Sequence, residues 1–303
     1  MKPGGAVDRF RSILRKLSST QAGASLGSPA PTPPRIGLAL GGGFARGIAH
    51  VGVLKALERE HIPIHCIAGV SAGAIVAAAY ASGTPVEDIA RIGCAMRFND
   101  VARWTIGWLG LVQSERMARF LKRLLKKYRF EEMGIPLGVL ATDLGTGQAV
   151  LFRDEGDVIL PIRASCSYPG LFQPIKYQDR LLVDGAMCME VPALLARKMG
   201  ATHVISVGMP MQGPVVTPQN MLQVVNRCFQ ILQNRNEDAW RQESDLVLTP
   251  DVRAVKWDGF ESGQQMIEAG ARAVEEALPK IREWLKPFAP AAAALNPAEQ
   301  LAG

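Results

Sequence analysis

A serine in a Gly-x-Ser-x-Gly pattern is the clearest candidate for chemistry in this sequence. Ser71 lies between Gly69 and Gly73, after an apolar run at residues 62–67 and before a small apolar run at residues 74–81. This context predicts a buried strand, a sharp turn and a helix so close to a sheet that a Cβ atom at either glycine would collide. The turn would hold the serine in a strained conformation and present its hydroxyl at the carboxyl edge of the sheet, as a nucleophile requires.

A second copy of the pattern occurs at residues 23–27, but it lacks the flanking elements. It lies in a stretch rich in serine, proline, alanine and glycine, with no strand pattern before it and no helix pattern after it. Because the pattern is short, accidental matches are common in a glycine-rich chain. We interpret this copy as chance and the one at Ser71 as the functional candidate.

A glycine loop at residues 41–47 follows the first expected strand, residues 35–40, and precedes a helix over about residues 48–60. Neither nucleotide-binding pattern fits it: Gly-x-Gly-x-x-Gly would need glycine at Arg46, and a P-loop would need Lys and then Ser or Thr after Gly47. Free backbone N–H groups that converge before a helix can still bind an anion. We expect this anion to be the oxyanion of an acyl transfer.

Two carboxylates at the ends of expected strands are candidate bases for Ser71. Asp184 ends the second strand of a hairpin, and Asp143 ends the strand over residues 137–142. Free aspartate, with a pKa near 3.9, is too weak a base, so burial beside apolar residues must raise that pKa. Chain order also permits a Ser–Asp–His triad with His203, but His203 opens its strand and would lie at the opposite edge of a parallel sheet.

The remaining pattern predicts an α/β protein with a mainly parallel sheet. We expect one folded domain over residues 34–286, a basic amphipathic segment with a flexible linker at residues 1–33, and an Ala/Pro-rich tail at residues 287–303. Residues 84–132 are expected to be mainly helical. Further strands are expected at residues 150–152, 175–177, 181–183, 202–207 and 245–248, and further helices at residues 115–128, 219–241 and 263–286.

The composition of the chain indicates which partners it binds and in which compartment it is located. The net charge of +6 favours anionic partners. Since no nucleic-acid motif is present, we expect no nucleic acid and prefer an anionic membrane surface. The five cysteines lack metal-site spacing and predict reduced thiols without structural zinc. No signal peptide pattern is present, so the expected location is cytoplasmic, peripheral at the inner face of the membrane.

Two segments allow both a structural and a membrane interpretation. The basic amphipathic pattern at residues 9–17 predicts either a membrane-surface helix or a solvated tail. The apolar stripe of the basic helix at residues 115–128 predicts core packing, and the alternative is a lid or an interfacial patch with Trp104 and Trp108 at a lipid surface.

Three motifs in chain order resemble the patatin-like phospholipase family: residues 41–47, 69–73 and 184–186. The runs at residues 141–144, 163–165 with Pro169, and 191–192 are similar to the bacterial branch related to neuropathy target esterase. The resemblance covers about residues 34–275. It implies a three-layer α/β/α fold related to cytosolic phospholipase A2. It also implies hydrolysis of lipid acyl esters, of the phospholipase A or lysophospholipase type, by a Ser–Asp dyad without metal or cofactor.

Carried over residue by residue, the resemblance makes Ser71 the nucleophile and Asp184 the base. It assigns the oxyanion hole to the N–H groups of Gly42, Gly43 and Phe44, with motif support from Gly41, Arg46, Gly47, Gly69, Gly73 and Gly185. Glu190 stands where the family usually has asparagine, and Ala186 stands where glycine is commoner. The alternative function is a non-catalytic lipid-binding or scaffold protein on the same fold. The lipid class and the oligomeric state do not follow from the sequence.

Overall fold

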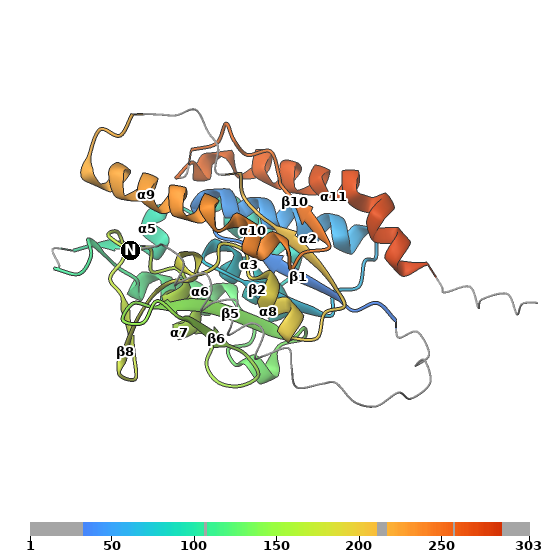
Figure 1. Ribbon diagram of the computed structural model, residues 1–303, viewed down its shortest axis with the longest axis horizontal. Helices are drawn as coiled ribbons and strands as arrows, with labels where there is room; N and C mark the ends of the chain where they lie inside the picture. The colour runs from blue at the N-terminus through green and yellow to red at the C-terminus, as the bar shows by residue number, and fades with distance from the viewer. Residues whose placement is uncertain (1–32, 106–107, 211–216, 257, 287–303) are drawn as a thin grey trace, which may run out of the picture. The chain divides into compact units, whose positions relative to one another are not determined.

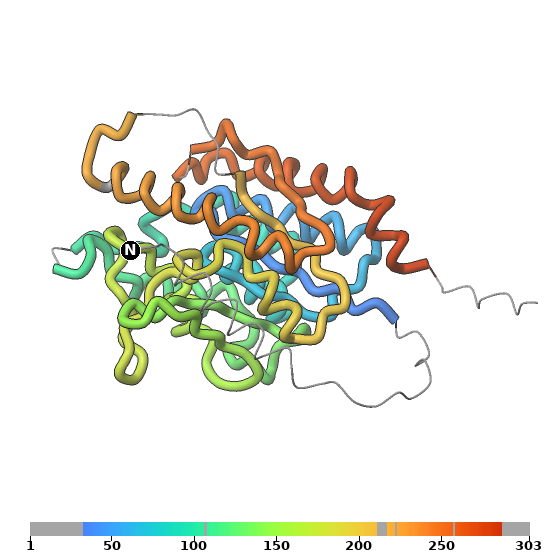
Figure 2. The backbone as a smooth tube through the Cα atoms, viewed as in Figure 1, coloured from blue at the N-terminus to red at the C-terminus, as the bar shows by residue number. Residues whose placement is uncertain are grey.

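Strands and helices alternate along most of the chain in the computed structural model (Figures 1 and 2). It describes residues 33–105, 108–210, 217–256 and 258–286, and Pro34–Lys286 form one compact unit. The amphipathic segment and linker predicted at residues 1–33, apart from Pro33, and the tail predicted at residues 287–303 lie outside the described residues.

The sheet has a parallel part and an antiparallel part. Its parallel strands pair in the order β10-β9-β1-β2-β5, and the antiparallel strands β6 and β8 both pair with β5, with β7 beyond β8. The parallel strands are short runs of mainly apolar residues, as expected for strands covered on both faces. They are β1 (Ile36–Leu40), β2 (Cys66–Gly69), β5 (Leu137–Asp143), β9 (His203–Val207) and β10 (Leu246–Leu248), and the others are β6 (Ala149–Phe152), β7 (Ile175–Tyr177) and β8 (Arg180–Asp184).

Helices cover both faces of the sheet and complete three layers, which confirms the predicted α/β/α fold. One face packs in a large apolar cluster with α2 (Ala49–Arg59), α3 (Ala72–Ala81), α4 (Val86–Ala95), α6 (Glu115–Leu124) and α11 (Gly263–Leu285). The other face packs with α8 (Ala193–Lys198) and, through Trp240, with α10 (Glu237–Arg241). The remaining elements are η1 (Phe44–Ile48), α5 (Phe98–Val101), η2 (Phe130–Glu132), α7 (Ile159–Ser165), η3 (Gly185–Met187), α9 (Met221–Arg235) and η4 (Phe260–Ser262).

Some predicted elements differ in extent from the observed ones. The strand expected at residues 62–67 is β2, which begins only at Cys66, after a loop that contains Pro63. The helix expected at residues 219–241 is divided into α9 and α10 at Asn236. The mainly helical segment at residues 84–132 contains a small antiparallel flap, β3 (Arg103–Trp104) with β4 (Val112–Gln113). The apolar stripe of α6 lies in the core, as its structural interpretation predicted.

A gap in the sheet lies beside β5. The even-numbered residues at the start of β5 form hydrogen bonds with β2, where the Ile67 N–H donates to the Pro136 carbonyl. Those at the end of β5 form hydrogen bonds with β8, where the Leu144 N–H donates to the Leu181 carbonyl. Strands β2 and β8 therefore occupy the same edge of β5 and run towards each other. β2 ends opposite Val139 and β8 ends opposite Ala141, so their carboxyl ends meet around Leu140.

Candidate active site

The turn after β2 has the strained geometry that its pattern predicts. Ser71 has φ 52° and ψ −125°, a conformation that non-glycine residues rarely adopt. A Cβ atom at Gly69 would lie 2.5 Å from the Ala74 Cα atom, and one at Gly73 would meet the carbonyl oxygens of Leu40 and Gly41. Both glycines are thus required by close backbone approach.

Ser71 and Asp184 meet across the gap in the sheet. The Ser71 side chain lies beside the Asp184 carboxyl and lowers its pKa, and the two side chains are 8% and 1% exposed. The Ala186 N–H donates to Asp184 Oδ1 over 2.9 Å. Burial raises the pKa of Asp184 to about 7, whereas the Ala186 N–H and the Ser71 side chain lower it. A carboxylate with that pKa can act as a general base near neutral pH.

The C-terminal turn of α7 holds both members of this pair. Ser165 Oγ accepts the Ser71 N–H over 2.8 Å and donates to the Leu140 carbonyl over 2.7 Å, which fills the gap in the sheet. Two residues later, the Ser167 carbonyl accepts the Asp184 N–H over 3.0 Å. The motif at residues 163–169 marked this turn, but its role became visible only in the fold.

A thiol also lies beside the pair. Cys166 is 7% exposed, and its thiol lies near both Ser71 and Asp184, which influence its pKa. Burial, with the nearby Asp184 charge, raises the pKa of Cys166 well above 9. The thiol is therefore neutral near pH 7 and does not compete as a nucleophile.

The glycine loop is fixed from three directions. The Gly41 N–H donates to the Val207 carbonyl over 3.0 Å, and the buried His50 donates from Nε2 to the Gly41 carbonyl over 2.9 Å. Burial lowers the pKa of His50 to about 4, so the ring is neutral. The Gly42 N–H donates to the Glu190 carbonyl over 3.2 Å.

This last hydrogen bond differs from the sequence-based expectation for Gly42. Its N–H supports the loop instead of facing a reacting oxygen, because the loop packs against the backbone of Glu190. The Gly43 N–H has no hydrogen-bond partner among the described residues and remains a candidate oxyanion donor. Phe44 stays a candidate because of its place in the motif. The same bond explains why Glu190 can stand where asparagine is usual, since its carbonyl makes the contact.

A pocket of about 260 Å³ opens above the pair. Its wall combines the glycine loop, the segment after α7 and the inner face of α9, with the following lining residues among others: Gly43, Phe44, Ser71, Tyr168, Leu171 and Asp184. Arg46 also lines it, donating from Nη1 to the Pro210 carbonyl over 3.0 Å, while its buried Nε has no partner among the described residues. Burial lowers the pKa of Arg46.

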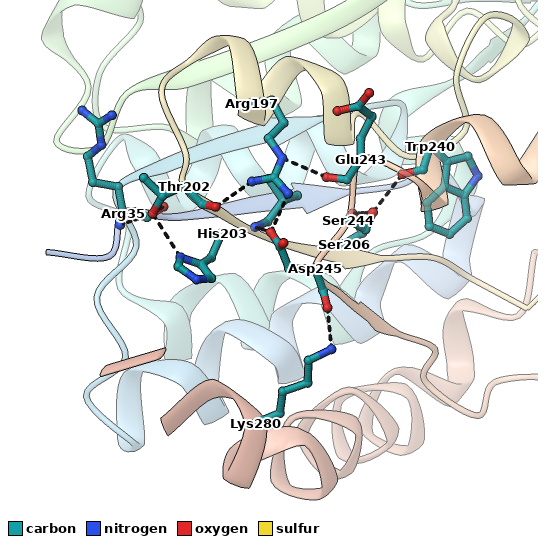
Figure 3. A network of polar contacts seen from close by, with 11 residues as sticks. Arg35, Arg197, Thr202, His203, Ser206, Trp240, Glu243, Ser244, Asp245 and Lys280 are labelled. Atoms are coloured by element: carbon teal, nitrogen blue, oxygen red, sulfur yellow. Dashed lines mark hydrogen bonds and ion pairs between the residues drawn. The ribbon is translucent and has the colours of Figure 1, made fainter. Parts of the chain in front are cut away.

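The two rival residues are less suited than Asp184 to act on Ser71. His203 begins β9 opposite Ile36, whereas Ser71 follows the far end of β2. Figure 3 shows its imidazole in a polar network at the amino ends of the strands, where Thr202 Oγ1 lies 3.1 Å from His203 Nδ1. Asp143 accepts the Gly145 N–H over 2.9 Å, which lowers its pKa and makes it a poorer base.

Among the described residues, no group of three or more His, Cys, Asp or Glu side chains is arranged to hold a metal ion. No helix in the part of the chain that the structure describes has the length and apolarity needed to cross a membrane.

Comparison with known proteins gives concordant matches. The patatin-like phospholipase family model matches residues 38–197. An uncharacterized NTE family protein of Mycobacterium tuberculosis is 32% identical over 191 residues, covering 62% of this chain and 52% of its own. Lysophospholipase NTE1 of Debaryomyces hansenii is 33% identical over 180 residues, covering 57% of this chain and 12% of its own.

One solved structure completes the comparison. ExoU of Pseudomonas aeruginosa, in complex with SpcU, has a TM-score of 0.49 and 16% identity, covering 84% of this chain and 54% of that one. The chain spans about half the length of the curated mycobacterial relatives that it matches.

Proposed function

This chain belongs to the patatin-like phospholipase family, and from that premise we propose that it is a serine hydrolase of lipid acyl esters. The observation that carries the proposal is that Ser71 and a buried Asp184, whose pKa is raised to about 7, line the same pocket. The pairing supplies a nucleophile and a base matched to neutral pH without a histidine. The name of the yeast relative, a lysophospholipase, supports a lipid ester as substrate.

The proposed reaction has two half-reactions. Ser71 Oγ attacks the acyl carbonyl while Asp184 takes its proton, and the N–H groups of Gly43 and Phe44 stabilise the oxyanion. The proton then passes from Asp184 to the leaving alcohol, which leaves an acyl-serine. Water, deprotonated by Asp184, attacks this ester, and the fatty acid leaves as the proton returns to Ser71.

Labelling with a fluorophosphonate tests the nucleophile directly. The wild-type chain should form one covalent adduct at Ser71 and hydrolyse p-nitrophenyl esters of graded chain length, and Ser71→Ala should do neither. The kcat/KM of the wild type should rise with pH and level off above about pH 7, since Asp184 must be ionised. A folded wild-type chain that neither reacts with the probe nor cleaves esters would favour the non-catalytic scaffold instead.

A further inference from the structure

Helix α9 has the reverse polarity of an ordinary surface helix. Of its residues that line the catalytic pocket, Val225 is apolar and the others are polar: Gln223, Asn226, Gln230 and Gln233. Its outer face carries four exposed apolar side chains: Met221 at 78%, Val224 at 49%, Ile231 at 43% and Leu232 at 54%. Because a helix normally turns its apolar face towards the core, this outer face is built to be covered by something apolar.

The flap formed by β3 and β4 carries a second exposed apolar group. Trp108 is fully exposed, and Trp104 and Leu109 are 58% and 64% exposed. The flap is nevertheless anchored, because the Leu111 N–H donates to the Leu171 carbonyl over 3.0 Å. Its exposed side chains are thus held by a structured base.

Both elements are attached to the loop that forms one wall of the catalytic pocket. Leu171 of this loop accepts the flap's hydrogen bond, and the Tyr168 hydroxyl donates to Asn226 Oδ1 of α9 over 2.8 Å. The Tyr168 ring also contacts Phe229 of α9, with centroids 5.6 Å apart. Figure 1 shows the flap and the N-terminal half of α9 at the same end of the described unit.

The charge of the two elements restricts what can cover them. Residues 102–113 and 217–236 contain three arginines, Arg103, Arg227 and Arg235, and no aspartate or glutamate. A surface of tryptophan, aliphatic side chains and arginine without acidic residues complements lipid headgroup phosphates above acyl chains. Tryptophan in particular prefers the boundary between headgroups and hydrocarbon.

We propose that the flap and the outer face of α9 dock on the surface of a lipid bilayer, with the mouth of the catalytic pocket against the headgroups. The choice of a bilayer over another protein rests on the proposed function, because a lipid hydrolase meets its substrate at a lipid surface and both elements contact the loop that lines the pocket. Docking would bring the acyl ester to the pocket without removing the lipid fully into water.

Co-sedimentation with vesicles tests the proposal on the full chain carrying Ser71→Ala, so that binding is measured without turnover. Vesicles contain phosphatidylcholine alone or with about one third phosphatidylglycerol. Two double variants remove the surface, Trp104→Ser with Trp108→Ser and Val224→Ser with Ile231→Ser. The matched control is Leu144→Ser, because Leu144 is 52% exposed but belongs to neither element.

Each double variant should lower the partition into vesicles on the order of tenfold or more, with more binding to anionic vesicles than to neutral ones. The control should bind like its parent, and circular dichroism should show all variants folded. With Ser71 restored, the same surface variants should hydrolyse a soluble ester at the parent rate.

Two results would overturn the proposal. One is an unchanged vesicle partition in both double variants. The other is a loss of self-association, seen by analytical ultracentrifugation without lipid, while vesicle binding stays intact, which would assign the surface to a second copy. Failure of the proposed function is distinguishable: a wild-type chain without esterase activity that still binds vesicles through these residues supports the docking surface alone.

Discussion

Replacing Asp184 by asparagine should make the protein more stable while it abolishes the esterase reaction. Burial raises the pKa of Asp184 from 3.8 to about 7, and about three units at about 1.36 kcal/mol each amount to about 4 kcal/mol. Below about pH 3.8 the carboxyl is neutral in both the folded and the unfolded chain, so ionisation does not affect stability. Above about pH 7 the Asp184 carboxyl is ionised in the folded chain too, and its burial lowers the free energy of unfolding by the full amount.

The variant isolates this effect because asparagine keeps the shape and the acceptor oxygen for the Ala186 N–H. Relative to the wild type, Asp184→Asn should gain up to about 4 kcal/mol at about pH 8 and about 2 kcal/mol at about pH 5. Urea denaturation followed by circular dichroism at both pH values gives the two differences in unfolding free energy. A stability difference that is the same at both pH values would refute the raised pKa, whatever happens to activity.

Five further substitutions at four positions test the other residues considered for the site. Ser165→Ala should lower kcat for soluble esters at least about tenfold with KM little changed, and Ser165→Thr, which keeps the hydroxyl, should recover part of it. If the lost activity matches a loss of folded protein, and kcat per folded molecule is unchanged, Ser165 stabilises the fold and does not position the catalytic pair. Gly42→Ala should fold and stay active, because its added Cβ would lie 3.5 Å from Ser71 Cβ, an ordinary contact, whereas Gly73→Ala should unfold or inactivate the protein. Thermal melts measure the folding of both variants, and ester assays measure their activity. A Gly42→Ala variant that is stable but inactive would show that the Gly42 N–H belongs to the oxyanion hole. His203→Gln should keep most of the esterase rate, and its loss with folding intact would overturn a histidine-free pair.

The turn at Ser71 and the position of His203 could be predicted from the sequence, because residues close to each in the chain determine them. Strand, turn and helix patterns flank Ser71 directly, and the glycines on either side are required by backbone atoms a few residues away or on the neighbouring strand. The expected position of His203 also followed from local reasoning, since a residue that opens a parallel strand lies at its amino end. The observed register with Ile36 agrees.

Contacts between segments far apart in the chain could not be predicted from the sequence pattern. Asp184 was expected at the carboxyl end of its strand, but β8 is antiparallel to β2, which would ordinarily put that end at the opposite edge of the sheet. The two ends meet only because β8 begins beyond the point where β2 stops, a register that depends on β5. The bond from Gly42 to Glu190 likewise joins segments about 150 residues apart in sequence. No pattern in either segment specifies such a partner.

The gap in the sheet also accounts for the basicity of Asp184. A carboxylate at an open sheet edge would be hydrated, and its pKa would stay near the ordinary value. Here the edge is closed on one side by the end of β2 and on the other by the turn of α7, which bonds to the Asp184 N–H through Ser167. The enclosure leaves Asp184 1% exposed, and burial raises its pKa by more than the Ala186 N–H and the Ser71 side chain lower it. Desolvation therefore outweighs hydrogen bonding, and the topology that brings the base to Ser71 is also what raises its pKa. A substitution that opens the α7 turn to water should consequently lower the pH at which kcat/KM levels off, even where the distance between the two side chains is unchanged.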